Sequence, residues 1–213
     1  MAIIMLFDEI SAALQAGNAR KTKELVQQAI DEKIPVKEIL EKGLLAGMDV
    51  IGSKFKNNEI YIPEVLISAR AMNQSIEILK PLLKSGGVEP VGRACIGTVQ
   101  GDLHDIGKNL VKLMLESKGF EVYDLGIDVS PEAFVNGAIE NNCSVICCSA
   151  LLTTTRIVMA DVVKAVENAG LKDKVKVMIG GAAVSKDFCD EIGADYFTTD
   201  AASAAEAALS IVK

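Results

Sequence analysis

Histidine is almost absent from this chain of 213 residues, which contains a single copy, His104. The chain also lacks any run of about 18 apolar residues, which a membrane-spanning helix would need. Its net charge of −7 comes with Lys and Arg scattered along the sequence, so there is no basic patch for nucleic acid. Residues 1–17 have no basic start before their apolar run and do not resemble a secretory signal. We therefore expect a cytoplasmic protein that binds neither nucleic acid nor membrane.

The cysteines show no pattern that would pair them or bind a metal. They are Cys95, Cys143, Cys147, Cys148 and Cys189. Their number is odd and no two are spaced as C-x-x-C, which argues against a disulfide framework and against a zinc site. Most of them stand in apolar runs, so we expect buried free thiols.

The first part of the chain has the hydrophobic period of helices. From residue 2 to about 84 apolar positions recur at helical spacing, and Gly17, Pro35 and Pro63 mark where segments stop or start. This pattern predicts a four-helix bundle. The stretch KSGGVEPVG, residues 84–92, has the composition of a linker. We therefore expect a helical domain at residues 1–88 and a second domain at 89–213.

In the second part the period changes to that of alternating strands and helices. Apolar, β-branched runs predict strands at 93–99, 120–126, 144–151, 175–181 and 194–200. Helical patterns follow them at 106–118, 131–141, 155–169, 185–192 and 201–212. Five strand-and-helix repeats predict an α/β domain with a doubly wound, Rossmann-like five-stranded parallel sheet. Such sheets bind ligands at the carboxyl ends of their strands.

Three loops at that edge carry chemically useful residues. They are Asp102, His104 and Asp105 after the first strand, Ser149, Thr153, Thr154 and Thr155 after the third, and Gly180 and Gly181 after the fourth. A nucleotide site is disfavoured because neither G-x-G-x-x-G nor G-x-x-x-x-G-K-[ST] is present. A phosphorelay is disfavoured because the aspartates bracket a histidine. A hydrolase is disfavoured because no G-x-S-x-G elbow supplies a nucleophile.

Metal ligation by the single imidazole remains. Asp102 stands two residues before His104 and could accept a hydrogen bond from one ring N–H, which would fix the tautomer. Protein zinc and iron sites usually take three or four ligands, so one histidine cannot hold a free ion tightly. The metal would then arrive inside a macrocycle, a haem or a corrin.

The spacing of these residues resembles the signature of cobalamin-binding corrinoid proteins that partner methyltransferases, which are similar to the two central modules of methionine synthase. The signature reads DLHDIG at residues 102–107, then 41 intervening residues, SAL at 149–151, 28 more, and GG at 180–181. The helical half resembles the cap of the same family over residues 47–72. There the resemblance places Phe55 and Ile62 over the upper face of the corrin.

The resemblance also implies a role for each matching residue. His104 would be the lower axial ligand of cobalt, replacing the dimethylbenzimidazole of the cofactor. Asp102 would be its hydrogen-bond partner and Thr155 the third member of a relay. Ser149 and Thr153 would contact the displaced nucleotide tail. The further cofactor-binding positions implied are Gly101, Leu103, Asp105, Ile106, Gly107, Leu151, Gly180, Gly181 and Ala182.

By this resemblance the chain is a non-catalytic corrinoid subunit that carries a methyl group on cobalt. It implies as partners a substrate-specific corrinoid methyltransferase, a second methyltransferase that passes the methyl group to tetrahydrofolate or coenzyme M, and a reductive activator. It also implies a hinge at residues 85–92, about which the cap would swing. Two alternatives remain, a cobalamin-binding subunit of an adenosylcobalamin mutase and a cobalamin-responsive sensor. The cap at 47–72 argues against the first, and the lack of a DNA-reading domain argues against the second.

Overall fold

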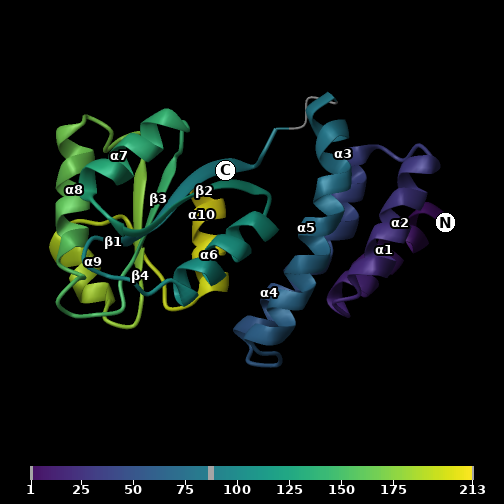
Figure 1. Ribbon diagram of the computed structural model, residues 1–213, viewed down its shortest axis with the longest axis horizontal. Coiled ribbons are helices and arrows are strands. Elements are labelled where there is room, and N and C mark those ends of the chain that lie inside the picture. Colours follow the sequence, from purple (N-terminus) through teal and green to yellow (C-terminus); the bar gives the residue numbers. More distant parts are fainter. Residues whose placement is uncertain (1, 86–88, 213) are drawn as a thin grey trace. The chain divides into compact units, whose positions relative to one another are not determined.

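The computed structural model describes residues 2–85 and 89–212. The chain divides into two compact units, Met1–Glu89 and Pro90–Lys213 (Figure 1). The boundary predicted near residue 88, together with the middle of the predicted linker and hinge, lies outside the described residues. None of the helices in the two described ranges combines the length and the apolar character that crossing a membrane requires.

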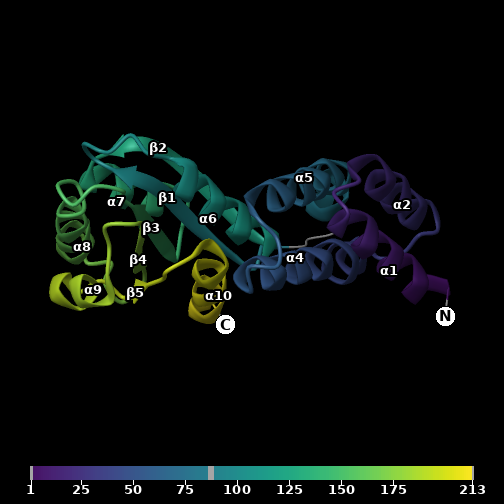
Figure 2. The same ribbon diagram turned by 90° about the horizontal axis from the view of Figure 1, so that it is seen from below.

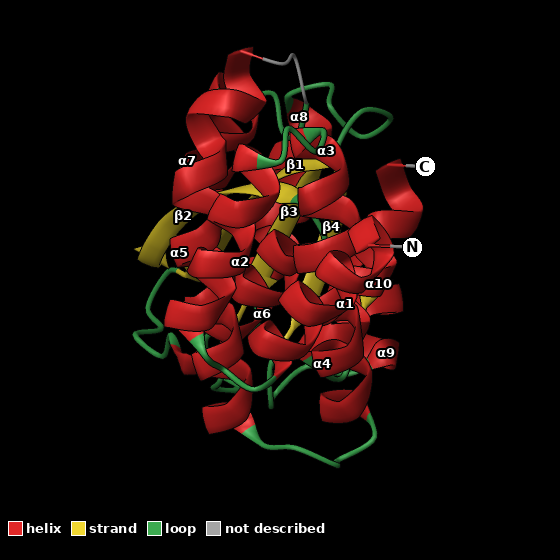
Figure 3. Cartoon of the chain, turned by 90° about the vertical axis from the view of Figure 1, so that its right-hand side faces the viewer, coloured by secondary structure: helices red, strands yellow, loops and turns green. Residues whose placement is uncertain are grey.

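The first unit, over residues 2–85, contains helices and no strand, and its labelled helices are drawn in red in Figure 3. Its elements are α1 (Ala2–Gln15), α2 (Ala19–Asp31), α3 (Val36–Glu38), η1 (Ile39–Leu45), α4 (Ala46–Lys56) and α5 (Ile62–Ser85). Because α3, η1 and α4 follow one another without a break, the unit has four helical segments. This confirms the predicted number. The first two breaks contain Gly17 and Pro35 as predicted, whereas the third lies at residues 57–61 and Pro63 is the second residue of α5.

The first of these breaks shows how the residues cause it. Gly17 has a φ of +66°, a left-handed conformation that glycine adopts at little cost. Asn18 then caps α2, because its side chain accepts a hydrogen bond from the backbone N–H of Lys21 at 3.0 Å. A side chain at position 17 would also collide with Ile67 of α5, since a Cβ there would lie 2.7 Å from it. Glycine at position 17 therefore allows both the left-handed turn and the close packing of Ile67 against it.

The π-helical stretch η1 is a feature that the hydrophobic period did not predict. It spans Ile39–Leu45 inside the third helical segment. Gly43 of this stretch lies close to α1, where an added Cβ would come within 3.0 Å of Ile10. Ile10 and Leu44 are fully buried, and Met48 and Met72 fill the same unit's interior, as expected for core methionines.

The second unit has a five-stranded parallel sheet, which confirms the predicted fold class. Its strands are β1 (Gly92–Val99), β2 (Phe120–Val129), β3 (Val145–Ser149), β4 (Lys176–Gly180) and β5 (Tyr196–Phe197), arranged in the order β2-β1-β3-β4-β5. Its helices are α6 (Ile106–Ser117), α7 (Pro131–Glu140), α8 (Val158–Asn168), α9 (Lys186–Ile192) and α10 (Ala201–Val212). Helices α6 and α10 pack together on one face, and α7 and α8 pack together on the other (Figure 2).

This strand order decides where a ligand site forms. After β1 the chain forms β2 on one side of β1, and it then returns to form β3 on the other side. The strand order therefore reverses between β1 and β3, which makes this the switch point of the sheet. Thr98 and Ser149 are register partners at their carboxyl ends. The loops that follow β1 and β3 therefore begin side by side, which brings residues 100–105 and 150–157 together.

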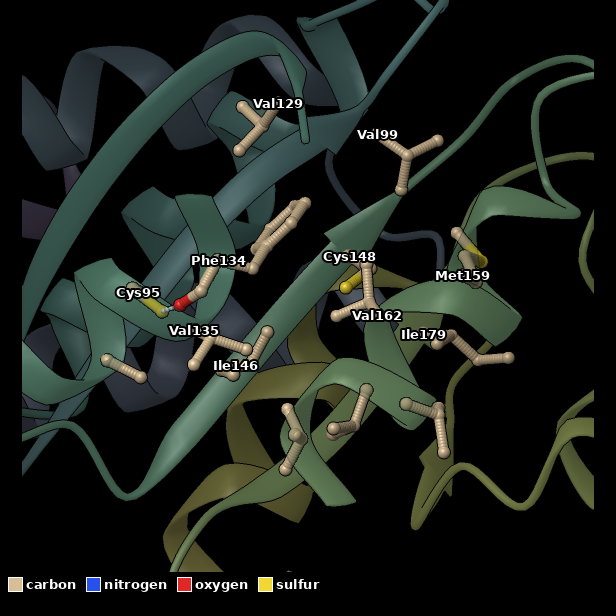
Figure 4. Packing of buried hydrophobic residues seen from close by; sticks show 14 of the residues in the cluster. Cys95, Val99, Val129, Phe134, Val135, Ile146, Cys148, Met159, Val162 and Ile179 are labelled. Atoms are coloured by element: carbon tan, nitrogen blue, oxygen red, sulfur yellow. Dashed lines mark hydrogen bonds between the residues drawn. The ribbon is translucent and has the colours of Figure 1, made fainter. Parts of the chain in front are cut away.

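A layer of buried apolar side chains separates the sheet from α7 and α8 (Figure 4). Phe134 of α7 is fully buried over β1, and Gly97 of β1 makes room for it, because a Cβ at position 97 would lie 2.9 Å from its ring. The thiol of Cys95 donates to the carbonyl of Phe134 at 3.8 Å. All five cysteines are free and buried, as expected.

Candidate functional site

The loop between β1 and α6 is folded tightly back on its strand. The Thr98 hydroxyl donates to the carbonyl oxygen of His104 at 2.9 Å, and the N–H of Asp102 donates to the carbonyl of Val99 at 3.1 Å. Gly101 supports this turn with a φ of +84°. These hydrogen bonds fix the backbone of Asp102 and of His104 to the end of β1.

Asp102 lies at the centre of the site, and its side chain is fully buried. One carboxylate oxygen, Oδ1, accepts hydrogen bonds from the backbone N–H of His104 at 3.1 Å and from its ring Nδ1 at 2.7 Å. The other, Oδ2, accepts from Thr155 Oγ1 at 2.7 Å and from the N–H groups of Leu151 at 2.9 Å and Leu152 at 3.3 Å. Five donors from two loops therefore converge on one side chain.

These donors determine the charge of Asp102. Burial alone would raise the pKa of its carboxyl group, but the hydrogen bonds from Thr155, His104 and Leu151 hold that pKa well below its usual range. The carboxylate is therefore ionised and can only accept. It follows that ring Nδ1 of His104 carries the hydrogen in this bond.

His104 itself is open to solvent, with 52% of its side chain exposed. Within the described ranges the ring is bonded only through Nδ1. A neutral imidazole with its proton on Nδ1 has its lone pair on Nε2, which is the form that ligates metals. The site therefore presents one fixed imidazole nitrogen, with Asp102 and Thr155 behind it in a chain of hydrogen bonds.

The surroundings of His104 fit a metal held in an apolar macrocycle. In the described part of the chain no three His, Cys, Asp or Glu side chains gather as ligands of a bare ion. The same loops expose large apolar side chains, Leu103 at 66%, Ile106 at 77% and Leu151 at 42%. Exposed apolar groups around a functional side chain are typical of a ligand surface. One nitrogen ligand and an apolar rim match the corrin that the resemblance implies.

The other predicted residues lie as follows. Thr155 is buried and takes part in the Asp102 network, whereas Thr153 is exposed in the same turn. Ser149 and Gly180 end neighbouring strands as register partners. Asp105 stands at the N-cap position of α6 but makes no side-chain capping bond there, and its carboxylate accepts from the side-chain NH₂ of Asn109 at 3.1 Å.

No atom lies within 4 Å of the position that a Cβ on Gly107 would occupy, and Ala182, which follows β4, is exposed. Phe55 in α4 and Ile62 in α5 belong to the helical unit, where Ile62 is 41% exposed.

Three contributors to the site were not found from the sequence. Leu152 adds a backbone donor to Asp102, and its side chain is exposed beside Leu151. Lys108 of α6 is almost fully buried, and its ammonium group donates to Asp124 of β2 at 2.6 Å. Asp128, near the end of β2, accepts from Gly101 at 2.7 Å. The apolar run that continues to Leu152 could have indicated that residue from the sequence. The roles of Lys108 and Asp128 depend on contacts between segments that are distant in sequence.

Gly181 gives a direct test of how closely the loops after β3 and β4 approach. Its φ is +127°, and a Cβ at this position would lie 2.0 Å from the carbonyl oxygen of Ala150. We expect Gly181→Ala to lower the free energy of unfolding by about 3 kcal/mol, because the clash is with backbone and the conformation is strained for alanine. Urea denaturation of the apoprotein measures this. Gly107→Ala is the control, since nothing lies within 4 Å of its Cβ position, and a comparable loss there would contradict the explanation.

Comparison with known proteins agrees with this geometry. A family model described as a B12 binding domain matches residues 92–209, and a second model of that description matches residues 6–80. The chain is 38% identical over 213 residues to a corrinoid protein of Desulfitobacterium hafniense, covering 99% of each. It is 40% identical over 212 residues to monomethylamine corrinoid protein 2 of Methanosarcina acetivorans, covering 98% of each.

A solved structure shows the same relationship. It is the crystal structure of the methanol:cobalamin methyltransferase complex MtaBC from Methanosarcina barkeri, one chain of which matches with a TM-score of 0.88 and 30% identity, covering 98% of this chain and 80% of that chain. The matches to both halves imply a cobalamin or corrinoid cofactor. They confirm the resemblance read from the sequence. The chain therefore belongs to the corrinoid proteins of the methylamine and methanol methyltransferase family.

Proposed function

We propose that this protein carries a methyl group on the cobalt of a bound corrinoid, and that His104 is the lower axial ligand. The observation that carries the proposal is the hydrogen bond of 2.7 Å between His104 Nδ1 and the buried, ionised Asp102. It leaves Nε2 as the nitrogen available to a metal. The corrin supplies the chemistry, a cobalt that is nucleophilic when reduced and accepts a methyl group.

The residues of the chain would hold and tune this group. Asp102 orients the His104 ring and increases the basicity of Nε2 through the Nδ1 hydrogen bond. Thr155 steadies the carboxylate from the opposite side at 2.7 Å. The exposed Leu103, Ile106 and Leu151 would contact the apolar part of the macrocycle.

The remaining predicted residues would serve the rest of the cofactor. Ser149 and Thr153, with the backbone of Gly180, Gly181 and Ala182, would contact the nucleotide tail. Gly101, Asp105 and Gly107 would shape the loop under the corrin. Phe55 and Ile62 of the helical unit would cover its upper face, so residues 1–88 would act as a cap and residues 89–213 as the cobalamin-binding domain. Donor and acceptor enzymes would need that face uncovered.

Partners follow from the chemistry. A substrate-specific corrinoid methyltransferase would load the cobalt, as the MtaBC relative forms a complex for methanol. Two relatives are named as monomethylamine and dimethylamine corrinoid proteins, so methylamines are the first donors to test. A second methyltransferase would pass the methyl group to tetrahydrofolate or coenzyme M, and a reductive activator would restore oxidised cobalt.

Electron paramagnetic resonance of the Co(II) state tests the ligand. Because the chain has one histidine, labelling histidine with ¹⁵N labels only His104. We expect the cobalt lines to split into triplets with ¹⁴N and into doublets with ¹⁵N-histidine. Splitting that does not change with the label would refute His104 as the ligand.

A second measurement tests the carrier role separately. Reduced holoprotein is incubated with a methylamine or methanol methyltransferase and its donor, and the absorbance of methylated cobalt is followed. Methylation with one donor system supports the carrier role. If cobalamin loads normally but no donor system in this class methylates it, the carrier role is wrong while the binding role stands.

A further inference from the structure

Asp128 has a backbone conformation that is unusual for its position. It lies within β2 and has a φ of +56°. The other non-glycine residues with positive φ in the described ranges are Lys33, Asn58 and Asn142. Each of these follows directly after a helix C-cap, where a left-handed residue is ordinary. A left-handed residue inside a strand needs surroundings that impose it.

The surroundings of Asp128 are the loop that carries His104. The side-chain Oδ1 of Asp128 accepts a hydrogen bond from the N–H of Gly101 at 2.7 Å. In return its own N–H donates to the carbonyl oxygen of Asp102 at 3.2 Å. The two bonds bracket Asp102, one on the residue before it and one on its carbonyl. Asp128 is thereby clamped to the backbone of the histidine loop.

The pairing of β1 with β2 shows that the strand is distorted where it makes this clamp. Ile96 pairs with Asp124, Gly97 with Gly126, and Val99 with Val129. Between each pair of these partners, β2 contains one residue more than β1 does. The extra residues form two bulges in β2 before its end. The second bulge contains Asp128. Bulges commonly re-aim a side chain next to an active site.

We propose that Asp128 is a positioning residue for the cobalt ligand, acting on His104 through Gly101 and Asp102. This inference rests on the proposed role of His104. Asp102 contacts His104 with its carboxylate, so a shift of its backbone changes the hydrogen bond that fixes the ring tautomer. The strain at Asp128 is then the cost of holding the loop in its ligating position.

Three variants separate the clamp from ordinary backbone effects. Asp128→Gly keeps the positive φ at no cost but removes the acceptor for Gly101. Asp128→Asn keeps an amide oxygen in the same place and tolerates the left-handed conformation. Asn142→Gly is the matched control, because Asn142 also has a positive φ, of 50°, but lies between α7 and β3, at the edge of the sheet opposite the histidine loop.

The first readout needs no cofactor. In apoprotein with ¹⁵N-histidine and no histidine tag, nuclear magnetic resonance reports the two ring nitrogens of His104 alone. The ¹⁵N chemical shifts of the two ring nitrogens differ between the Nδ1–H and Nε2–H forms, so the tautomer is read directly. We expect a proton on Nδ1 in the wild type, Asn142→Gly and Asp128→Asn. In Asp128→Gly we expect a mixture of both tautomers.

The second readout is cobalamin binding by the same full-length variants. We expect Asp128→Gly to weaken it roughly tenfold, as loss of an outer-shell partner does, while Asp128→Asn stays within about threefold of the wild type. A change in unfolding midpoint without a change in tautomer or affinity would mean a merely structural role and would overturn the inference. So would an unchanged tautomer and affinity in Asp128→Gly.

One measurement on the wild type covers the case in which Asp128→Gly does not fold. The N–H of the exposed Gly101 is bonded to Asp128, so its hydrogen exchange should be slowed. Exchange at the rate of an unstructured amide would show that the clamp is absent.

The inference and the proposed function can fail separately. If the cobalt spectrum lacks the histidine nitrogen, the proposed function fails, yet the tautomers measured in the apoprotein still decide whether Asp128 positions the loop.

Discussion

Replacing His104 by alanine should remove the histidine nitrogen from the cobalt spectrum while leaving the protein folded. The ring is half exposed and is bonded through Nδ1 alone within the described ranges. Its loss therefore removes little buried surface, and we expect the free energy of unfolding of the apoprotein to change by about 1 kcal/mol or less. Cobalamin should still bind through the tail contacts, but about 100-fold more weakly, because a direct ligand is worth at least as much as an outer-shell partner.

Rescue by added imidazole distinguishes a lost ligand from a damaged site. In the His104→Ala variant a free imidazole can reach the space left by the ring and ligate the cobalt, so millimolar imidazole should restore the nitrogen splitting. Methyl transfer should recover in parallel. Nitrogen splitting that persists in the variant without imidazole would come from another nitrogen, such as the cofactor's own base, so the rescue is followed with ¹⁵N-imidazole. No doublet splitting from the added imidazole and no recovery of methyl transfer would contradict the assignment.

Much of this site was predictable because its parts are local or regularly spaced. The interval between Asp102 and His104 is two residues, and the strands that carry Ser149 and Gly180 follow from apolar runs. Parallel strands bring such loops to one edge, so the Asp102, His104 and Thr155 side chains could be expected close together. The structure places all three in one hydrogen-bonded chain.

The parts that were not predicted depend on contacts between distant segments. The helix predicted from residue 155 begins at Val158, because residues 152–157 form a turn in which the Thr155 hydroxyl reaches Asp102. The last strand, expected over 194–200, is only Tyr196–Phe197 and pairs with a single neighbour at the sheet edge. A charged residue such as Lys108 looks exposed in a helical pattern, and its bonds to Asp124 and Asn109 explain its burial.

Replacing Asp102 by asparagine should lower both the stability of the protein and the ligation of cobalt by His104. The carboxylate accepts from three donors on Oδ2 and from two on Oδ1. An amide has one oxygen and one NH₂ group, so it can satisfy only one of these sides. In either orientation of the asparagine side chain, its NH₂ group faces hydrogen-bond donors of the protein, which then have no acceptor. We expect the free energy of unfolding to fall by about 3 kcal/mol, measured by urea denaturation.

The orientation that loses fewer hydrogen bonds also disables the histidine. With the amide oxygen toward Thr155, Leu151 and Leu152, the NH₂ group faces His104, and ring Nδ1 must accept instead of donate. The ring proton then moves to Nε2, whose lone pair is no longer free for a metal. Asp102→Asn should therefore show the Nε2–H tautomer in the apoprotein and lose most of the cobalt nitrogen splitting.

The neighbouring aspartate provides the matched control for this change. Asp105 directly follows His104 in the sequence and is exposed. Its carboxylate accepts a hydrogen bond from the side-chain NH₂ of Asn109. Asp105→Asn makes the same chemical substitution where water can solvate the amide, so it should change the free energy of unfolding by about 0.5 kcal/mol or less. It should also keep the Nδ1–H tautomer. If both variants behaved alike, the effect would come from lost negative charge near the cobalt rather than from the geometry that Asp102 imposes on the ring.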